Sequence, residues 1–163
     1  MLARREQTAE LIDRPFNNLL RRLNPADYAS LAPHLTGDEA KPGELLYNPG
    51  DNVQTVHFPC GPTLVSYMVP NEDGRDVETI LIGREGAVGG IVSHGFLPAF
   101  TRITVKFGGP IVRLSVIKLE AANMSARISQ HSKSNLGFHL IIRVIRVREF
   151  LIVSFFERIS EFQ

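Results

Sequence analysis

Apolar and polar positions change their spacing twice along the 163 residues of this chain. The first 15 residues are polar and are expected to be loosely ordered or a frayed helix. Asn24-Pro25-Ala26-Asp27 then combines a capping side chain, a proline suited to the first helical turn and an acidic residue near the positive helix end. Two short helices are predicted around this signal, and their apolar residues recur at helical spacing. These residues are Phe16, Leu19, Leu20 and Leu23 before the signal and Tyr28, Leu31 and Leu35 after it.

From Thr36 the pattern changes to short apolar runs that are separated by turn residues. Pro-Gly pairs at 42–43 and 49–50 mark turns between short strands. The run from Thr63 to Gly83 indicates a hairpin, because Asn71 to Gly74 supplies residues that tolerate a positive φ.

A second hairpin is predicted over 100–116. Ile103, Val105 and Phe107 alternate there with polar neighbours, and Gly108-Gly109-Pro110 is the predicted turn. Many short strands at regular spacing favour an antiparallel sandwich or a jelly-roll barrel.

From about Val116 the spacing is helical again, and 136–163 is long and apolar. Its apolar positions alternate steps of three and four residues, which is the spacing of a coiled-coil seam, and Arg148 interrupts them. A second apolar row indicates two partners, the chain's own barrel and a second copy of the chain. The alternative is a Val/Ile-rich strand over 139–147, but charges gathered on one helical face favour the helix. The predicted dimer interface is Phe138, Ile141, Ile145, Ile152, Phe155 and Ile159.

Composition narrows the function classes. The net charge is +1, so no general basic field indicates a nucleic-acid partner. The single Cys60 excludes an internal disulfide and an iron–sulfur cluster of cysteines, and it is more typical of packing than of a haem or redox site with His57. No apolar run predicts a membrane span or a secretory signal, so a cytoplasmic location is expected.

Candidate catalytic chemistry is sparse. The histidines lack the spacing of a metal site, and no nucleophile motif is present. No metal site and no enzyme activity are therefore predicted, and a cupin-like jelly-roll enzyme with dispersed ligands is the least favoured alternative. The five histidines are His34, His57, His94, His131 and His139.

Three stretches carry a resemblance to a known family: "KPGELLYNPGD" at 41–51, "VHFPCGPTLVSYMVPNEDGRDVE" at 56–78, and the segment 82–105. Together they resemble the effector domain of Crp/Fnr-type transcription regulators and, more broadly, the cyclic-nucleotide-binding domain, over most of 16–120. The resemblance implies a mainly β fold with flanking helices, a double-stranded β-helix jelly roll, followed by a long C-terminal dimerisation helix. The expected organisation is a polar segment at 1–15, the β-roll at 16–130 and the dimerisation helix at 131–163.

The resemblance also makes "IGREGAVGG", from Ile82 to Gly90, the turn of a phosphate-binding cassette. Relatives that bind cyclic AMP have Gly-Glu-apolar-Gly there, where the Glu binds the ribose, followed by an Arg that neutralises the cyclic phosphate. Here Gly86-Ala87-Val88-Gly89 matches the turn, but Ala87 replaces the Glu, and Arg102 is shifted from the phosphate position. The candidate ligand-binding residues are Gly86, Ala87, Val88, Gly89, Gly90, Thr101 and Arg102.

The favoured hypothesis is the effector-sensing and dimerisation part of a Crp/Fnr-like regulator. It would bind an unknown small-molecule effector and pair with itself, without a membrane partner. DNA would be read only through a helix-turn-helix domain that is expected beyond this chain. No cofactor is predicted, and tight binding of a cyclic nucleotide is not expected. The alternative is a stand-alone dimeric interaction module with a vestigial pocket.

Overall fold

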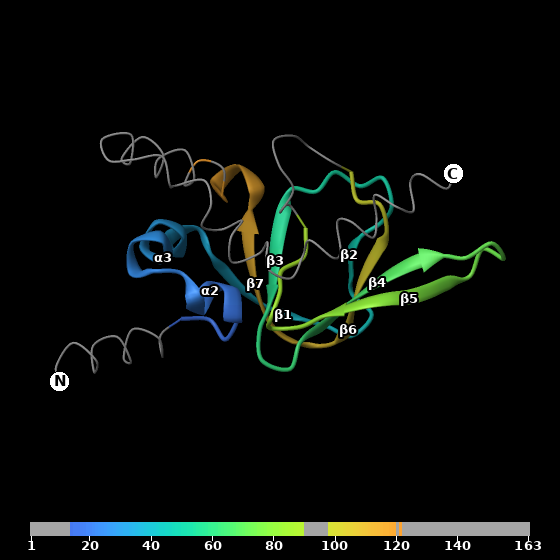
Figure 1. Ribbon diagram of the computed structural model, residues 1–163, viewed down its shortest axis with the longest axis horizontal. Coiled ribbons are helices and arrows are strands. Elements are labelled where there is room, and N and C mark those ends of the chain that lie inside the picture. The colour runs from blue at the N-terminus through green and yellow to red at the C-terminus, as the bar shows by residue number, and fades with distance from the viewer. Residues whose placement is uncertain (1–13, 90–97, 120, 122–163) are drawn as a thin grey trace. The chain divides into compact units, whose positions relative to one another are not determined.

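The computed structural model describes residues 14–89, 98–119 and 121, and it begins with two short helices (Figure 1). Helix α2 (Asn18–Arg22) is capped by Asn17, whose side chain accepts hydrogen bonds from the amides of Leu19 and Leu20. Helix α3 (Pro25–Leu31) is capped by Asn24, and the 3-10 turn η1 (Ala32–His34) continues from it. Both predicted helices and the Asn24 cap are confirmed.

Seven strands follow and form two antiparallel sheets, one in the order β1-β7-β3 and the other in the order β2-β6-β4-β5. The strands are β1 (Thr36–Ala40), β2 (Leu45–Tyr47), β3 (Thr55–Pro59), β4 (Leu64–Pro70), β5 (Asp76–Ile82), β6 (Arg102–Phe107) and β7 (Gly109–Ser115). The mainly β fold with helices beside it is confirmed.

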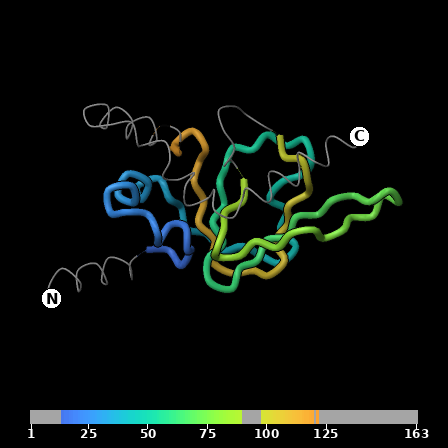
Figure 2. Tube along the Cα trace, in the orientation of Figure 1, coloured from blue at the N-terminus to red at the C-terminus, as the bar shows by residue number. Residues whose placement is uncertain are grey.

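The hairpin predicted over Thr63 to Gly83 is present as β4 and β5. Its tip extends past the other strands in Figure 2. Asn71 closes the turn, because its carbonyl accepts from the amide of Gly74 at 2.9 Å and its side chain accepts from the amide of Arg75 at 2.8 Å. Gly74 has a φ of +74°, as the turn requires.

The second predicted hairpin is wrong, although both of its strands exist. Strand β6 pairs with β2 and β4, whereas β7 pairs with β1 and β3, so the chain crosses from one sheet to the other. A Cβ at Gly108 would lie 2.6 Å from the carbonyl oxygen of Ala40. The glycines therefore serve a close crossing between the sheets and do not make a hairpin turn. Beyond a register shift in β4, Phe107 is exposed while Ile103 and Val105 are buried.

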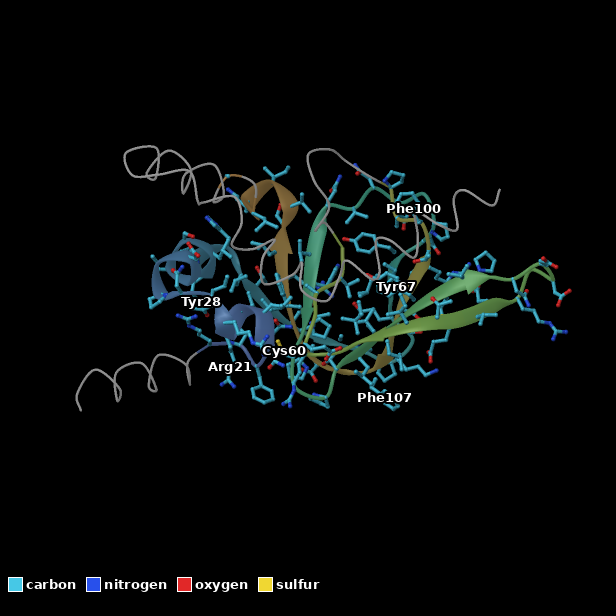
Figure 3. All side chains as sticks on the ribbon, in the orientation of Figure 1. Arg21, Tyr28, Cys60, Tyr67, Phe100 and Phe107 are labelled. Atoms are coloured by element: carbon cyan, nitrogen blue, oxygen red, sulfur yellow. The ribbon has the colours of Figure 1, made fainter. Side chains whose placement is uncertain are left out.

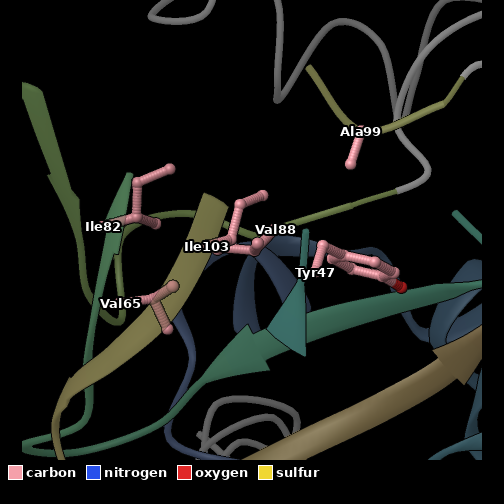
Figure 4. Packing of buried hydrophobic residues seen from close by; sticks show 6 residues of the cluster. All are labelled: Tyr47, Val65, Ile82, Val88, Ala99 and Ile103. Carbon is pink, nitrogen blue, oxygen red and sulfur yellow. The ribbon is translucent and has the colours of Figure 1, made fainter. Parts of the chain in front are cut away.

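The apolar core lies between the two sheets. One cluster joins residues of β2, β4, β5 and β6 with two residues of the connecting segments, as Figure 4 shows. A smaller cluster of Ala40, Val105 and Ile111 joins β1, β6 and β7. The larger cluster is Tyr47, Val65, Ile82, Val88, Ala99 and Ile103.

The opposite face of the β1-β7-β3 sheet is also buried, through Val56, Phe58, Val112 and Leu114. These residues alternate with those that face the roll interior. Helices α2 and α3 lie on this side of the sheet in Figure 1, and they bury Leu20 and Leu31.

The expectation of a loose N-terminal segment does not hold for Arg14. Its side chain is buried and donates to the carbonyl of Leu23 at 2.6 Å. Its guanidinium also stacks on the ring of Tyr28, with 4.2 Å to the ring centroid. The packed part of the chain therefore includes Arg14.

The helical pattern predicted from about Val116 begins as expected, with helix at 116–119. The predicted dimerisation helix at 131–163, with all its interface residues, lies outside the described residues, as does the predicted end of the β-roll at 130.

Candidate functional site

The glycine-rich segment turns earlier than predicted. The amide of Gly86 donates to the carbonyl of Gly83 at 3.1 Å, and the Glu85 carboxylate accepts from the amide of Gly83 at 2.8 Å. A hydrogen-bonded turn is therefore present at 83–86, just before the segment 86–89 that was predicted as the cassette turn. After it the chain is extended, because Val88 and His57 exchange both backbone hydrogen bonds, at 2.7 and 2.8 Å.

The candidate residues after this turn are packed against the roll. The side chains of Ala87 and Val88 are 2% and 0% exposed. Gly89 has a φ of +83°, and a Cβ there would lie 2.6 Å from the carbonyl oxygen of Thr55. The amides of Gly86 and Val88 already donate to carbonyls of the fold, so these two amides are engaged and do not face a ligand. Gly90 lies outside the described residues.

Arg102 is separated from the cassette. Its neighbour Ile103 packs in the same cluster as Val88, so strand alternation places Arg102 on the other face of the sheet. There it forms an ion pair with Asp76 of β5 and is about half exposed. Thr101 is buried. The structure brings Gly86 to Gly89 together with β3 but does not bring Arg102 to them.

The space inside the roll next to Val88 is filled by apolar groups and by the ring of Tyr47. The Tyr47 hydroxyl donates to the Thr55 carbonyl at 2.6 Å and accepts from the Thr55 amide at 3.1 Å. Burial raises the pKa of this hydroxyl above its usual value. The cluster itself contains no cationic side chain that could neutralise a phosphate.

Asn17 is a site residue that the sequence did not reveal. Its side chain is fully buried, and its Nδ2 donates to the carbonyls of Pro59 at 2.8 Å and Gly86 at 2.9 Å. The next amide, Asn18, donates to the carbonyl of Arg84 at 2.7 Å. One residue thus caps α2 and also holds the cassette turn. An asparagine before a helix indicates a cap, but no local pattern indicates these distant partners.

Phe16 adds a second tie between α2 and the turn. The guanidinium groups of Arg21 and Arg84 lie over its ring, at 4.7 and 4.8 Å from the centroid. The contact of Arg84 connects the turn at 83–86 to the helical segment. Figure 3 labels Arg21 and also the buried Cys60, which follows β3.

A polar cluster around Arg113, partly exposed to solvent, was also missed. Arg113 of β7 is paired with Asp38 and with Glu44, each at 2.9 Å. In the sheet register it lies opposite His57 of β3, whose side chain is 6% exposed. Burial, assisted by the charge of Arg113, lowers the pKa of His57 to about 4. A cavity of about 330 Å³ adjoins these groups. Strand alternation alone could have placed them inward, but their neighbours could not be deduced.

Within the described ranges, no helix is both long and apolar enough to cross a membrane. In the same part of the chain, no three His, Cys, Asp or Glu side chains come together in a way that could hold a metal ion.

No protein-family model matches the sequence, and neither does any curated protein. Solved structures do match. The N-terminal domain of a transcriptional regulator from Streptomyces coelicolor A3(2) is 16% identical, with a TM-score of 0.61 over 84% of this chain and 92% of that one. The Thermus thermophilus catabolite activator protein is 12% identical, with a TM-score of 0.62 over 88% of this chain and 63% of that one.

A third similar structure is the regulator CLP from Xanthomonas campestris, described as responsive to c-di-GMP. It is 13% identical, with a TM-score of 0.60 over 85% of this chain and 63% of that one. The chain therefore spans less than two thirds of the length of two of these three proteins. All three are regulatory proteins, and the predicted resemblance is confirmed at the level of the fold. The described residues form a β-roll of the cyclic-nucleotide-binding-like kind.

Proposed function

We propose that this chain is the effector-sensing part of a Crp/Fnr-like transcription regulator in the cytoplasm. The shared fold with regulator domains supports this function. The observation that carries it is the buried Asn17, because one side chain bonds both to the cassette turn and to the start of α2. A ligand that shifts the turn would thereby shift the helical segment, provided that it binds the two arrangements with different affinity.

The effector of this regulator is not a conventional cyclic nucleotide. A cyclic phosphate needs a cation, but Arg102 is paired with Asp76 on the far face of the sheet. The groups next to Val88 are apolar. CLP, described as responsive to c-di-GMP, is an example of this fold in a protein that answers to another effector.

Isothermal titration calorimetry with cyclic AMP and cyclic GMP tests this part of the proposal. We expect no tight binding of either nucleotide to the full chain. Micromolar or better affinity would overturn the exclusion of cyclic nucleotides while leaving a sensory role in place.

The second part of the proposal is a homodimer formed through the seam at 138–159, with DNA read by a helix-turn-helix domain outside this chain. Multi-angle light scattering should give a dimer. Ile145→Arg should shift the equilibrium toward monomer, because a charge would have to be buried in the seam. Ser160→Arg, which lies on neither apolar row, is the matched control. A wild-type monomer would sink the role given to the seam residues.

A stand-alone interaction module is the second candidate function. The observation that favours it is the apolar filling next to Val88, which leaves little room for a ligand beside the cassette turn. NMR chemical-shift mapping distinguishes the two candidate functions. Only a sensor should show ligand-dependent chemical-shift changes that spread from the turn at 83–86 to α2.

A further inference from the structure

The polar cavity in the roll is distinct from the cassette. It lies between β2, β3 and β7, and none of the described candidates, Gly86 to Gly89, Thr101 or Arg102, lines it. Its volume of about 330 Å³ is at the lower end of the range for small-molecule sites, ~300–1,000 Å³. The lining residues are Glu44, Leu45, Leu46, Tyr47, Asn52, Gln54, Thr55, His57 and Arg113.

The charges in this cavity are balanced. Arg113 is held between the carboxylates of Glu44 and Asp38, and of these two acids only Glu44 lines the cavity. His57 is neutral at physiological pH, because it is buried next to Arg113. An anionic ligand would face the Glu44 carboxylate, and a cationic one would face the Arg113 guanidinium. The lining therefore favours a neutral ligand.

Two buried polar atoms of the cavity residues have no partner among the described residues, Nδ1 of His57 and Nε of Arg113. They belong to residues that lie opposite each other in the β3–β7 register, so they share one face of the sheet. A buried polar atom without a hydrogen bond is costly, and native folds leave few of them. Both atoms are themselves buried, so a ligand in the cavity would use the more exposed polar groups of the lining.

The remaining polar groups specify the ligand further. Glu44 can only accept hydrogen bonds, whereas the amides of Asn52 and Gln54 both donate and accept, and these two residues are exposed. A hydroxyl group donates and accepts at once, so a ring of hydroxyls can match this mixture without carrying a charge. We propose that the cavity between β2, β3 and β7 binds a small neutral polyhydroxylated molecule of about monosaccharide size.

This inference does not depend on the regulator proposal, because it concerns binding alone. The test is protein-observed NMR on the full chain with a panel of glucose, galactose, mannose, ribose and myo-inositol. At least one member should shift the ring nitrogen signals of His57 and leave those of the other four histidines in place. If no member shifts His57 at millimolar concentrations, the proposal fails. A stronger response to inorganic phosphate or acetate overturns the neutral class of ligand.

Variants locate the bound molecule. Gln54→Leu removes the side-chain amide, which both donates and accepts, from an exposed lining residue, so the fold should survive. It should weaken binding about five- to tenfold, the usual effect of one hydrogen bond. Glu72→Leu, an equally exposed change at the tip of the β4–β5 hairpin, is the matched control and should leave the affinity unchanged. Equal effects of the two variants would show that binding occurs elsewhere.

Discussion

At the scale of the residue, Asn17 shows how one amide side chain can join segments that are distant in sequence. Its Oδ1 accepts from the amides of Leu19 and Leu20, while its Nδ2 reaches the carbonyls of Pro59 and Gly86. The side chain is 0% exposed; its bonds with Pro59 and Leu20 are buried, and those with Gly86 and Leu19 are partly buried. Few of these bonds could be replaced by solvent if the side chain were removed.

Asn17→Ala should therefore lower the free energy of unfolding by about 2–4 kcal/mol, through a lost cap and two buried carbonyls left unpaired. Urea denaturation measures this change. Asn24→Ala is the matched control, since Asn24 caps α3 through Asp27 at the surface. It should cost only about 1 kcal/mol. Equal losses would mean that the bonds to Pro59 and Gly86 contribute nothing.

His57 makes stability depend on pH in a defined window. Its pKa is about 4 in the folded chain and 6.5 when exposed. Between these values the unfolded chain binds a proton that the folded chain does not, so stability rises with pH. The free energy of unfolding should fall by up to about 3 kcal/mol from pH 7 toward pH 4.

Urea denaturation across this range measures the slope, and His57→Gln should flatten it. His34→Gln, at an exposed histidine of η1, is the matched control. A slope unaffected by His57→Gln would contradict the assignment to His57.

Glu78 makes stability depend on pH over a lower range. Hydrogen bonds from Ser66 and Lys106 lower its pKa, so its contribution to the stability of the fold is present above its usual pKa of 4.5 and is lost below it.

At the scale of the element, the connection from β6 to β7 decides how the sheets join. Both strands could be predicted from alternation, but the turn residues between them indicated a hairpin. The structure instead uses Gly108 where the chain passes close to Ala40 and Pro42. Glycine accommodates both a tight turn and a close backbone approach, and the local sequence does not distinguish the two.

Gly108→Ala should destabilise the fold by about 2 kcal/mol, because its Cβ would meet the Ala40 carbonyl oxygen at 2.6 Å and Cδ of Pro42 at 2.7 Å. Thermal denaturation gives the comparison with Gly37→Ala. A Cβ at Gly37 in β1 meets nothing within 4 Å, so this control should be neutral or slightly stabilising. Similar melting temperatures for the two variants would remove the argument for a crowded crossing.

At the scale of the whole molecule, local patterns predicted the two N-terminal helices, the strands and the β4–β5 hairpin, and the family resemblance implied the kind of β-roll. The partners across the roll could not be predicted in this way. His57 and Arg113 become neighbours only because β3 and β7 pair, and Asn17 meets Gly86 only because the helices lie on that sheet. The turn at 83–86 was not predicted, because the segment contains several glycines and any of them could make a turn.

Cys60 lies where three distant parts of the chain meet. Its amide donates to Pro110 at 3.0 Å, and the next amide, Gly61, donates to Phe16 at 3.2 Å. The sequence has a single cysteine, which is buried, and burial raises the pKa of its thiol. A thiol reagent can therefore label the protein only when this junction opens. The rate of labelling therefore measures how often the N-terminal segment separates from the roll. This measurement needs no probe elsewhere in the chain.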